Sequence, residues 1–129
     1  MKVWDSNVFK IQQKISNPEN KLLYGEVYTP YELISEMMEM IPKPLFKNPN
    51  LKWLDPGSGY GYFSIFLFHK LFISLEEAIP EPDLRRDHII KNMITMVEVN
   101  EMHITVLKEL FGEKCNIINM DFLELDTVE

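Results

Sequence analysis

Hydrophobic positions along the chain follow two periods, which indicates helices alternating with strands. Apolar side chains recur at helical spacing over 31–41 and 101–111, and a longer apolar run predicts a buried helix over 63–75. Shorter runs rich in β-branched or aromatic residues predict strands. The expected order is helix 31–41, strand 51–54, helix 63–75, strand 94–99, helix 101–111 and strand 115–120.

This alternation predicts an α/β fold with three parallel strands joined by right-handed helical crossovers. Residues 1–23 are predicted to form an N-terminal arm or helix, and 24–129 the α/β unit. Prolines are expected to end the first helix before a loop over 46–50. The charged segment 76–87 holds two further prolines, so we expect a helix end that continues as a loop, and Gly112 is expected to stop the last helix.

Composition narrows the classes of function. The net charge is −7 and the pI is about 5.0, which argues against a large nucleic-acid-binding face on this chain. The single cysteine, Cys115, excludes an internal disulfide or a cysteine-based zinc site, and we interpret it as a small core residue. No signal peptide or membrane-spanning run is visible, so we expect a cytoplasmic location.

Three of the five glycines lie in one short stretch, LDPGSGYGYF, directly after the first predicted strand. A glycine-rich turn between a strand and a helix lets backbone approach a ligand closely and directs the helix N-terminus at it. A purely structural tight turn is the alternative. A phosphate-binding P-loop is excluded because Gly61 lacks the following Lys-Ser/Thr, and a hydrolase elbow because Pro56 precedes Ser58 by two positions. The dinucleotide fingerprint also fails, because its glycine spacing differs.

The stretch resembles the S-adenosylmethionine loop of class I methyltransferases, and more narrowly the Asp-Pro-x-x-Gly-x-Gly-x-Phe form of N6-adenine DNA methyltransferases of restriction–modification type. The resemblance implies a Rossmann-like fold, of which this chain has the N-terminal, cofactor-binding half, and S-adenosyl-L-methionine as the cofactor. The residues it places at the cofactor in this loop are Asp55, Pro56, Gly57, Ser58, Gly59, Gly61 and Phe63.

One helix upstream, the segment GEVYTP resembles the Gly-x-x-Phe/Tyr-Thr-Pro element that closes over the methionine end of the cofactor in that family. This likeness implies cofactor contacts from Tyr28, Thr29 and Pro30. A simple helix start is the alternative, because Thr29 is a suitable N-cap and Pro30 suits the first helical position.

Two acids follow the later strands. Glu98 ends the second strand, where an acid can accept hydrogen bonds from both ribose hydroxyls, and Val99 would flank the adenine. In the family an Asp-Phe pair follows the third strand, which implies that Asp121 accepts from the adenine amine and that Phe122 lies beside the ring. The alternatives are a surface Glu98, a helix-capping Asp121 and a core Phe122.

The chain departs from the family in two respects. The loop-to-Glu98 distance is about twice the ~20 residues of a compact unit, so 74–87 looks like an insertion. The catalytic Asn/Asp/Ser-Pro-Pro-Tyr/Phe segment of the family does not occur in these residues, so no catalytic residue is assigned. We therefore expect a catalytically incomplete portion of such an enzyme, with DNA contacted through regions absent from this chain.

The missing strands also have a physical consequence. In the family sheet the first strand is central, so a three-stranded sheet would leave 51–54 as an open edge. We expect self-association or a partner chain to cover that edge. The alternatives are a non-catalytic methyltransferase-like partner subunit, or a methyltransferase for RNA, protein or a small molecule.

Overall fold

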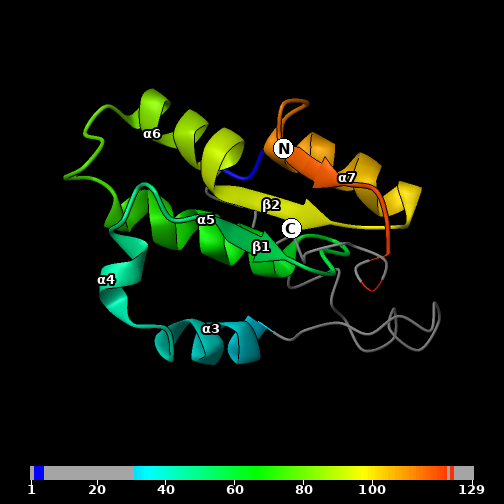
Figure 1. Ribbon diagram of the computed structural model, residues 1–129, viewed down its shortest axis with the longest axis horizontal. Helices are drawn as coiled ribbons and strands as arrows, with labels where there is room; N and C mark the ends of the chain where they lie inside the picture. Colours follow the sequence, from blue (N-terminus) through cyan, green and yellow to red (C-terminus); the bar gives the residue numbers. More distant parts are fainter. Residues whose placement is uncertain (1, 5–30, 122, 124–129) are drawn as a thin grey trace.

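A computed structural model describes residues 2–4, 31–121 and 123 of the chain. Three parallel strands form one sheet in the order β1-β2-β3, namely β1 (Trp53–Asp55), β2 (Ile94–Val97) and β3 (Asn116–Ile118). Figure 1 shows β2 between its two neighbours. The register pairs Leu54 with Thr95 and Thr95 with Asn116. The arrangement is the predicted one, a partial Rossmann-like α/β fold with β1 at an edge of the described sheet.

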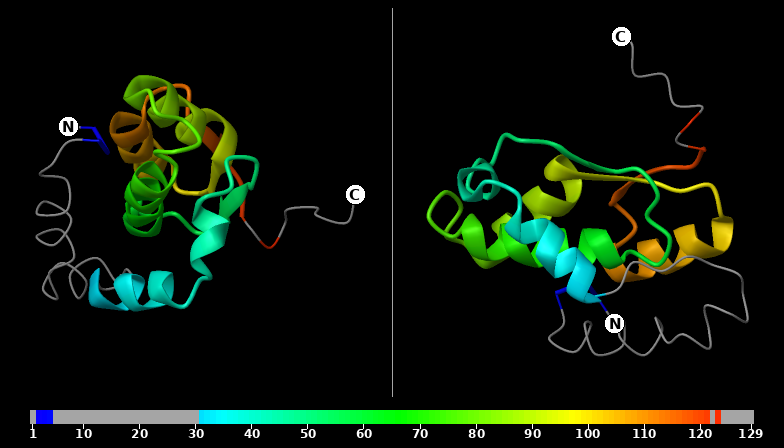
Figure 2. Two further views of the ribbon diagram at one scale, coloured as in Figure 1. Left: turned by 90° about the vertical axis from the view of Figure 1, so that its left-hand side faces the viewer. Right: turned by 90° about the horizontal axis from the view of Figure 1, so that it is seen from below.

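The crossover helices are α5 (Tyr62–Ser74), which lies between β1 and β2 in the chain, and α7 (Glu101–Phe111), which joins β2 to β3. Both lie on the same face of the sheet (Figure 2). This follows from parallel strands added in one direction with crossovers of one hand. Gly112 ends α7 with a φ of 90°, as predicted, and its amide donates to the Lys108 carbonyl at 2.9 Å.

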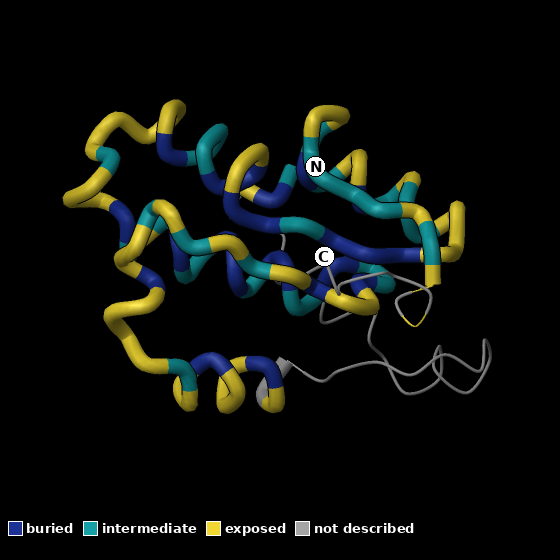
Figure 3. Tube along the Cα trace, in the orientation of Figure 1, coloured by how far each residue is buried: buried dark blue, intermediate teal, exposed yellow. Residues whose placement is uncertain are grey.

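The core lies between the sheet and these helices, and Figure 3 shows the buried positions concentrated along α5 and β2. The residues of α5 that are buried are Ser64, Ile65, Leu67, Phe68 and Leu71. Helix α3 (Tyr31–Glu39) packs on α5 through Ile34 and Met38, whereas Leu33 and Met37 of its predicted apolar face are exposed.

One prediction of loop structure is wrong, and one short helix was not predicted. The loop predicted over 46–50 is present except at Phe46, which ends the unpredicted helix α4 (Lys43–Phe46); Pro42 is its N-cap and Phe46 is buried. Helix α6 (Pro82–His88) occupies part of the charged segment predicted to be loop. Pro82 stands in the first turn, where a missing amide proton costs nothing, and Glu81 caps the helix through the amides of Asp83 and Leu84.

A π-helical turn, η1 (Ile89–Met93), continues α6 into β2. His88 ties this region to the loop before β1, because its Nε2 lies 2.7 Å from the Pro49 carbonyl oxygen. At the N-terminus, Val3 is buried and its amide donates to the Leu110 carbonyl at 2.7 Å. Over the described residues no helix has both the length and the apolar character needed to cross a membrane.

Candidate functional site

The carboxyl ends of the three strands meet at one edge of the sheet, where parallel α/β folds place their ligands. β1 ends at Asp55, β2 at Val97 and β3 at Ile118. The glycine loop leaves β1 at this edge, and Glu98 leaves β2 beside it. Two segments far apart in sequence, both predicted to bind one ligand, are thereby brought into contact.

Backbone hydrogen bonds fix the glycine loop onto the end of β2. The amide of Ser58 donates to the Val97 carbonyl at 3.1 Å, and the amide of Gly61 donates to the Ser58 carbonyl at 2.7 Å. Gly61 is the N-cap of α5, with a φ of 87° and no side-chain cap. The loop therefore turns sharply into the helix N-terminus without placing a capping side chain there.

Backbone conformation and neighbouring atoms restrict the three glycines of the loop to different extents. Gly61 and Gly59 have positive φ, at 87° and 52°, which favours glycine on backbone grounds alone. A Cβ on Gly61 would also lie 2.9 Å from Leu107 Cδ2. Gly57 has no positive φ, and a Cβ there would meet no atom of the described residues within 4 Å. The folded chain gives no internal reason for glycine at position 57, and the space beside it is open.

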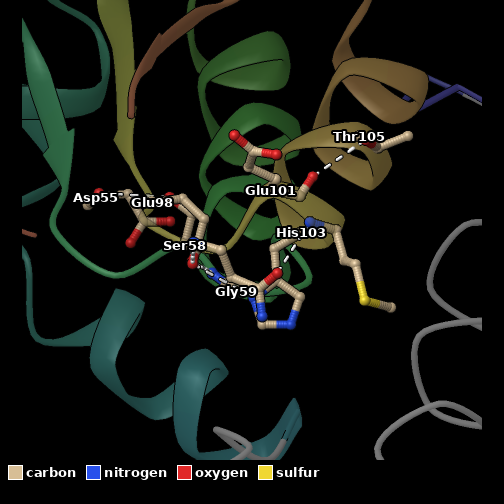
Figure 4. Close-up of polar contacts among 9 residues, drawn as sticks. Asp55, Ser58, Gly59, Glu98, Glu101, His103 and Thr105 are labelled. Carbon is tan, nitrogen blue, oxygen red and sulfur yellow. Dashed lines mark hydrogen bonds and ion pairs between the residues drawn. The ribbon is translucent and has the colours of Figure 1, made fainter. Parts of the chain in front are cut away.

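Glu98 is the centre of the polar contacts at this edge (Figure 4). Its side chain is 9% exposed. Oε1 accepts from the backbone amide of Gly59 at 2.7 Å, and Oε2 accepts from the backbone amide of Asn100 at 2.9 Å. The predicted ribose-binding acid therefore holds the glycine loop in place from the tip of the neighbouring strand.

Asp55 is buried beneath the same loop. Its Oδ2 accepts from the Ser64 hydroxyl at 2.6 Å. Burial raises the pKa of the Asp55 carboxyl above its ordinary value, and the neighbouring charge of Glu98 raises it further, while hydrogen bonds from Ser64, Ser58 and the Gly57 amide oppose the rise. These contacts make Asp55 an organiser of the loop, and its predicted role toward the methionine moiety stays a prediction.

Sequence reasoning missed one residue of this cluster, His103 in the first turn of α7. Its Nδ1 lies 3.4 Å from Glu98 Oε2, and its ring centroid lies 4.6 Å from that of Tyr60 in the glycine loop. The only signal in the sequence is its position five residues after Glu98. That spacing brings the two side chains together only because a helix starts directly after the strand.

The other predicted contacts are placed less closely. Val99 is 62% exposed, and Asp121 is exposed and accepts from the Leu123 amide at 3.0 Å in a local turn. Pro56 is exposed, whereas Phe63 is half-buried against the core. The remaining residues predicted to contact the cofactor, Tyr28, Thr29, Pro30 and Phe122, lie outside the described residues. The cofactor contacts of all these positions stay predictions.

The sequence predicts Cys115 to be a small core residue and not a reactive thiol. The thiol is half-buried and packs against the core, and burial raises its pKa, which disfavours the reactive thiolate.

Two pockets lie away from the glycine loop. One has a volume of 240 Å³ and is lined in part by Met38 and His69, and the other has a volume of 320 Å³ and is lined in part by Trp4 and Arg86. Neither is lined by a residue of the glycine loop.

Comparison with known proteins gives one similarity of note. No family model matches the chain. Over 94 residues, 70% of this chain, the sequence is 31% identical to an uncharacterized adenine-specific methylase of Mycoplasma pneumoniae. The match spans 21% of that protein, so this chain corresponds to about a fifth of the relative's length.

Proposed function

We propose that this chain is the S-adenosylmethionine-binding portion of a DNA adenine-N6 methyltransferase of the restriction–modification type. The observation that carries the proposal is the contact between Glu98 and the Gly59 amide at the carboxyl edge of the sheet. This contact joins the glycine loop, where backbone can approach a nucleoside cofactor closely, to Glu98, the acid proposed to bind its sugar. The name of the bacterial relative, an adenine-specific methylase, supports the choice of adenine as target.

The residues at this edge fit such a cofactor in two respects. Among the described residues, space is open beside Gly57 and Gly59, where added Cβ atoms would meet no atom of that part of the chain within 4 Å. Glu98 also keeps acceptor capacity, because a carboxylate offers about four lone-pair positions and the two amides use one on each oxygen. One acceptor position per oxygen is left, which matches the two hydroxyls of a ribose.

In this proposal Glu98 holds the ribose, the loop from Asp55 to Gly61 holds the methionine end with Tyr28, Thr29 and Pro30, and Asp121 with Phe122 and Val99 takes the adenine. The bound cofactor supplies an electrophilic methyl group on a sulfonium. In that complex the chain's own residues would bind and orient the cofactor. Methyl transfer to a flipped adenine requires the Pro-Pro-aromatic segment, which these 129 residues do not contain.

The proposed enzyme needs further protein beside β1. In the described sheet β1 has β2 on one side and no strand on the other, and Leu54 is 44% exposed. We propose that a second copy of this chain, or a partner chain that carries the catalytic segment and the DNA-binding surface, covers this edge. The net charge of −7 supports placing the DNA contacts on that other region.

The proposal is tested by calorimetric titration of the folded chain with S-adenosylhomocysteine, the stable product form of the cofactor. Replacing Glu98 by Gln removes the charge that accepts the ribose hydroxyls, a loss of about 1.5–3 kcal/mol or roughly 10- to 100-fold in affinity. Glu101→Gln is the matched control, because this exposed acid lies three residues further on, and its affinity should equal that of the unchanged chain.

Gly57→Ala is the sharper variant. The open space beside Gly57 predicts that the added methyl leaves stability unchanged, whereas a ligand packed against the backbone would lose about tenfold or more in affinity. Circular dichroism establishes the fold of each variant. A folded, unchanged chain that binds no S-adenosylhomocysteine would contradict the proposal, as would a Gly57→Ala variant that binds as tightly as the parent.

A further inference from the structure

Helix α3 has one apolar row in the core and a second apolar row on the surface. The buried row contains Ile34 and Met38, which pack against α5. Three further apolar side chains, Leu33, Met37 and Met40, are 46%, 41% and 83% exposed. Positions 33, 37 and 40 follow the i, i+4, i+7 spacing of one helix face, so these side chains form a continuous row. We call Leu33, Met37 and Met40 the outer row of α3.

The composition of the outer row is typical of a surface that binds another chain. Single exposed apolar side chains are common and need no explanation, whereas a contiguous apolar patch marks an interaction site. Two of the three side chains are methionines, Met37 and Met40, whose unbranched thioethers adapt to the shape of a partner. The outer row is therefore a candidate docking surface.

Acidic side chains border the outer row. The sequence of α3, YELISEMME, contains three glutamates and no basic residue. Glu36 is exposed and lies one turn from both Leu33 and Met40 on the helix surface. Glu39 is exposed in the last turn, where the helix dipole makes a negative charge unfavourable. No ion pair among the described residues involves either glutamate, so a cation supplied by a partner would be favourable here.

The place of α3 in the fold and its charge indicate a different chain as the partner. Figure 1 shows α3 beyond β1, on the side opposite β2, so the outer row belongs to the part of the molecule next to the open edge of β1. A second copy of this chain suits the row poorly. A two-fold contact would bring Glu36 and Glu39 of one copy close to the same acids of the other, and like charges at an interface are costly.

We infer that the outer row of α3 docks an amphipathic helix of a partner chain, one that carries lysine or arginine beside its apolar side chains. A helix is the element whose own apolar ridge fits a row at i, i+4, i+7 spacing, and the basic side chains would pair with Glu36 and Glu39. No residue of the outer row belongs to the glycine loop. The inference therefore does not rest on cofactor binding.

The inference is tested by fluorescence anisotropy with three labelled peptides of about 18 residues, long enough to form a helix. The first has leucines at i, i+4, i+7 spacing with lysines beside them, and the second has glutamates in place of the lysines. The third has the composition of the first in an order that forms no apolar row. We expect the folded chain to bind the first peptide about tenfold or more tightly than either of the others.

Variants of the chain locate the contact. Met37→Gln removes apolar surface without changing the charge, so it should weaken binding of the lysine peptide about tenfold. Leu84→Gln is the matched control, because Leu84 is 63% exposed on α6, and its affinity should equal that of the parent. Glu36→Gln should weaken binding about threefold and reduce its salt dependence. Glu76→Gln removes the same charge from an exposed position after α5 and should leave binding unchanged.

Circular dichroism establishes that each variant is folded, and Leu33→Gln replaces Met37→Gln if the latter does not fold. Failure of the lysine peptide to bind the folded parent overturns the inference. Equal binding of the reordered peptide, or equal losses from Met37→Gln and Leu84→Gln, also overturns it, because attraction of opposite charges alone would then account for the binding. A chain that binds the lysine peptide but not S-adenosylhomocysteine refutes the proposed function alone.

Discussion

At the scale of single residues, the loop separates glycines required by the fold from a glycine that the fold does not require. Gly61→Ala should lower the free energy of unfolding by about 2–4 kcal/mol, because alanine is strained at its φ of 87° and its Cβ would lie 2.9 Å from Leu107 Cδ2. Urea denaturation measures the loss. Gly57→Ala is the control and should stay within about 0.5 kcal/mol of the parent, and equal losses at both positions would refute the distinction.

The buried carboxyl of Asp55 leads to a prediction of how the stability of the fold depends on pH. Burial raises its pKa in the folded protein, so the folded state keeps this proton to a higher pH than the unfolded chain does. The contribution of Asp55 to stability is therefore largest below its ordinary pKa of 3.8 and declines as the pH rises through the folded value.

Asp55→Asn removes that titration while keeping an oxygen that can accept from the Ser64 hydroxyl. Denaturation series from acid to neutral pH should show a decline in the parent that is smaller in the variant. Ser64→Ala provides the companion measurement, because it removes the hydrogen bond that opposes the rise and should steepen the decline. An identical dependence of stability on pH in the parent and in Asp55→Asn would show that the pKa of the Asp55 carboxyl is not raised.

At the scale of elements, α6 is held by an arginine that sequence reasoning did not single out. Arg85 is 6% exposed, its guanidinium carbon lies 4.1 Å from the centre of the Phe72 ring, and Nη1 donates to the Ile79 carbonyl at 3.3 Å. Arg85→Ala should cost on the order of 2 kcal/mol, because a desolvated cation–π contact and the buried stem are both lost.

Its neighbour Arg86 is the natural control for that measurement. Arg86 pairs with Asp83 at 3.3 Å and with Asp87 at 3.5 Å, and its guanidinium carbon lies 4.8 Å from the centre of the ring of Trp4, which is 38% exposed; the Arg86 side chain is itself 29% exposed. Such partly exposed pairs contribute about 0–1 kcal/mol, so Arg86→Ala should be the milder change in thermal or urea denaturation. The reverse order would show that the Phe72 contact does not anchor α6.

Elements with a strong local signal were predicted well, and the rest depended on context. The range of α7, Glu101–Phe111, was predicted correctly because Asn100 and Gly112 mark its ends. Helix α6 was missed because Pro82 was interpreted as a breaker, although at the first helical turn proline is favoured. His103 was missed because no local pattern shows which side chains the fold places against Glu98. The sequence pattern predicts individual helices and strands, whereas the contacts between their side chains depend on how the crossovers place them in space.

At the scale of the whole molecule, the open edge of β1 is the feature that a complete enzyme would have to cover. β1 is three residues long and has a strand on one side only in the described sheet. A sheet edge presents unpaired backbone groups, and an exposed leucine adds apolar surface beside them. We expect the isolated chain to associate through this edge, so that sedimentation velocity shows a species larger than the 15.3 kDa monomer.

Leu54→Lys tests whether β1 is the surface involved. Leu54 is 44% exposed on β1, so a charged side chain there is tolerated by the monomer but opposes burial at an interface, and the variant should shift toward the monomer by about tenfold in dissociation constant. Met40→Lys is the matched control, because Met40 is 83% exposed and follows α3, away from the sheet. A parent that sediments as a monomer, or a Met40 variant that dissociates as readily as the Leu54 variant, would place the interface elsewhere. Since the glycine loop begins one residue after Leu54, association through β1 would also bring a second chain next to the proposed cofactor site.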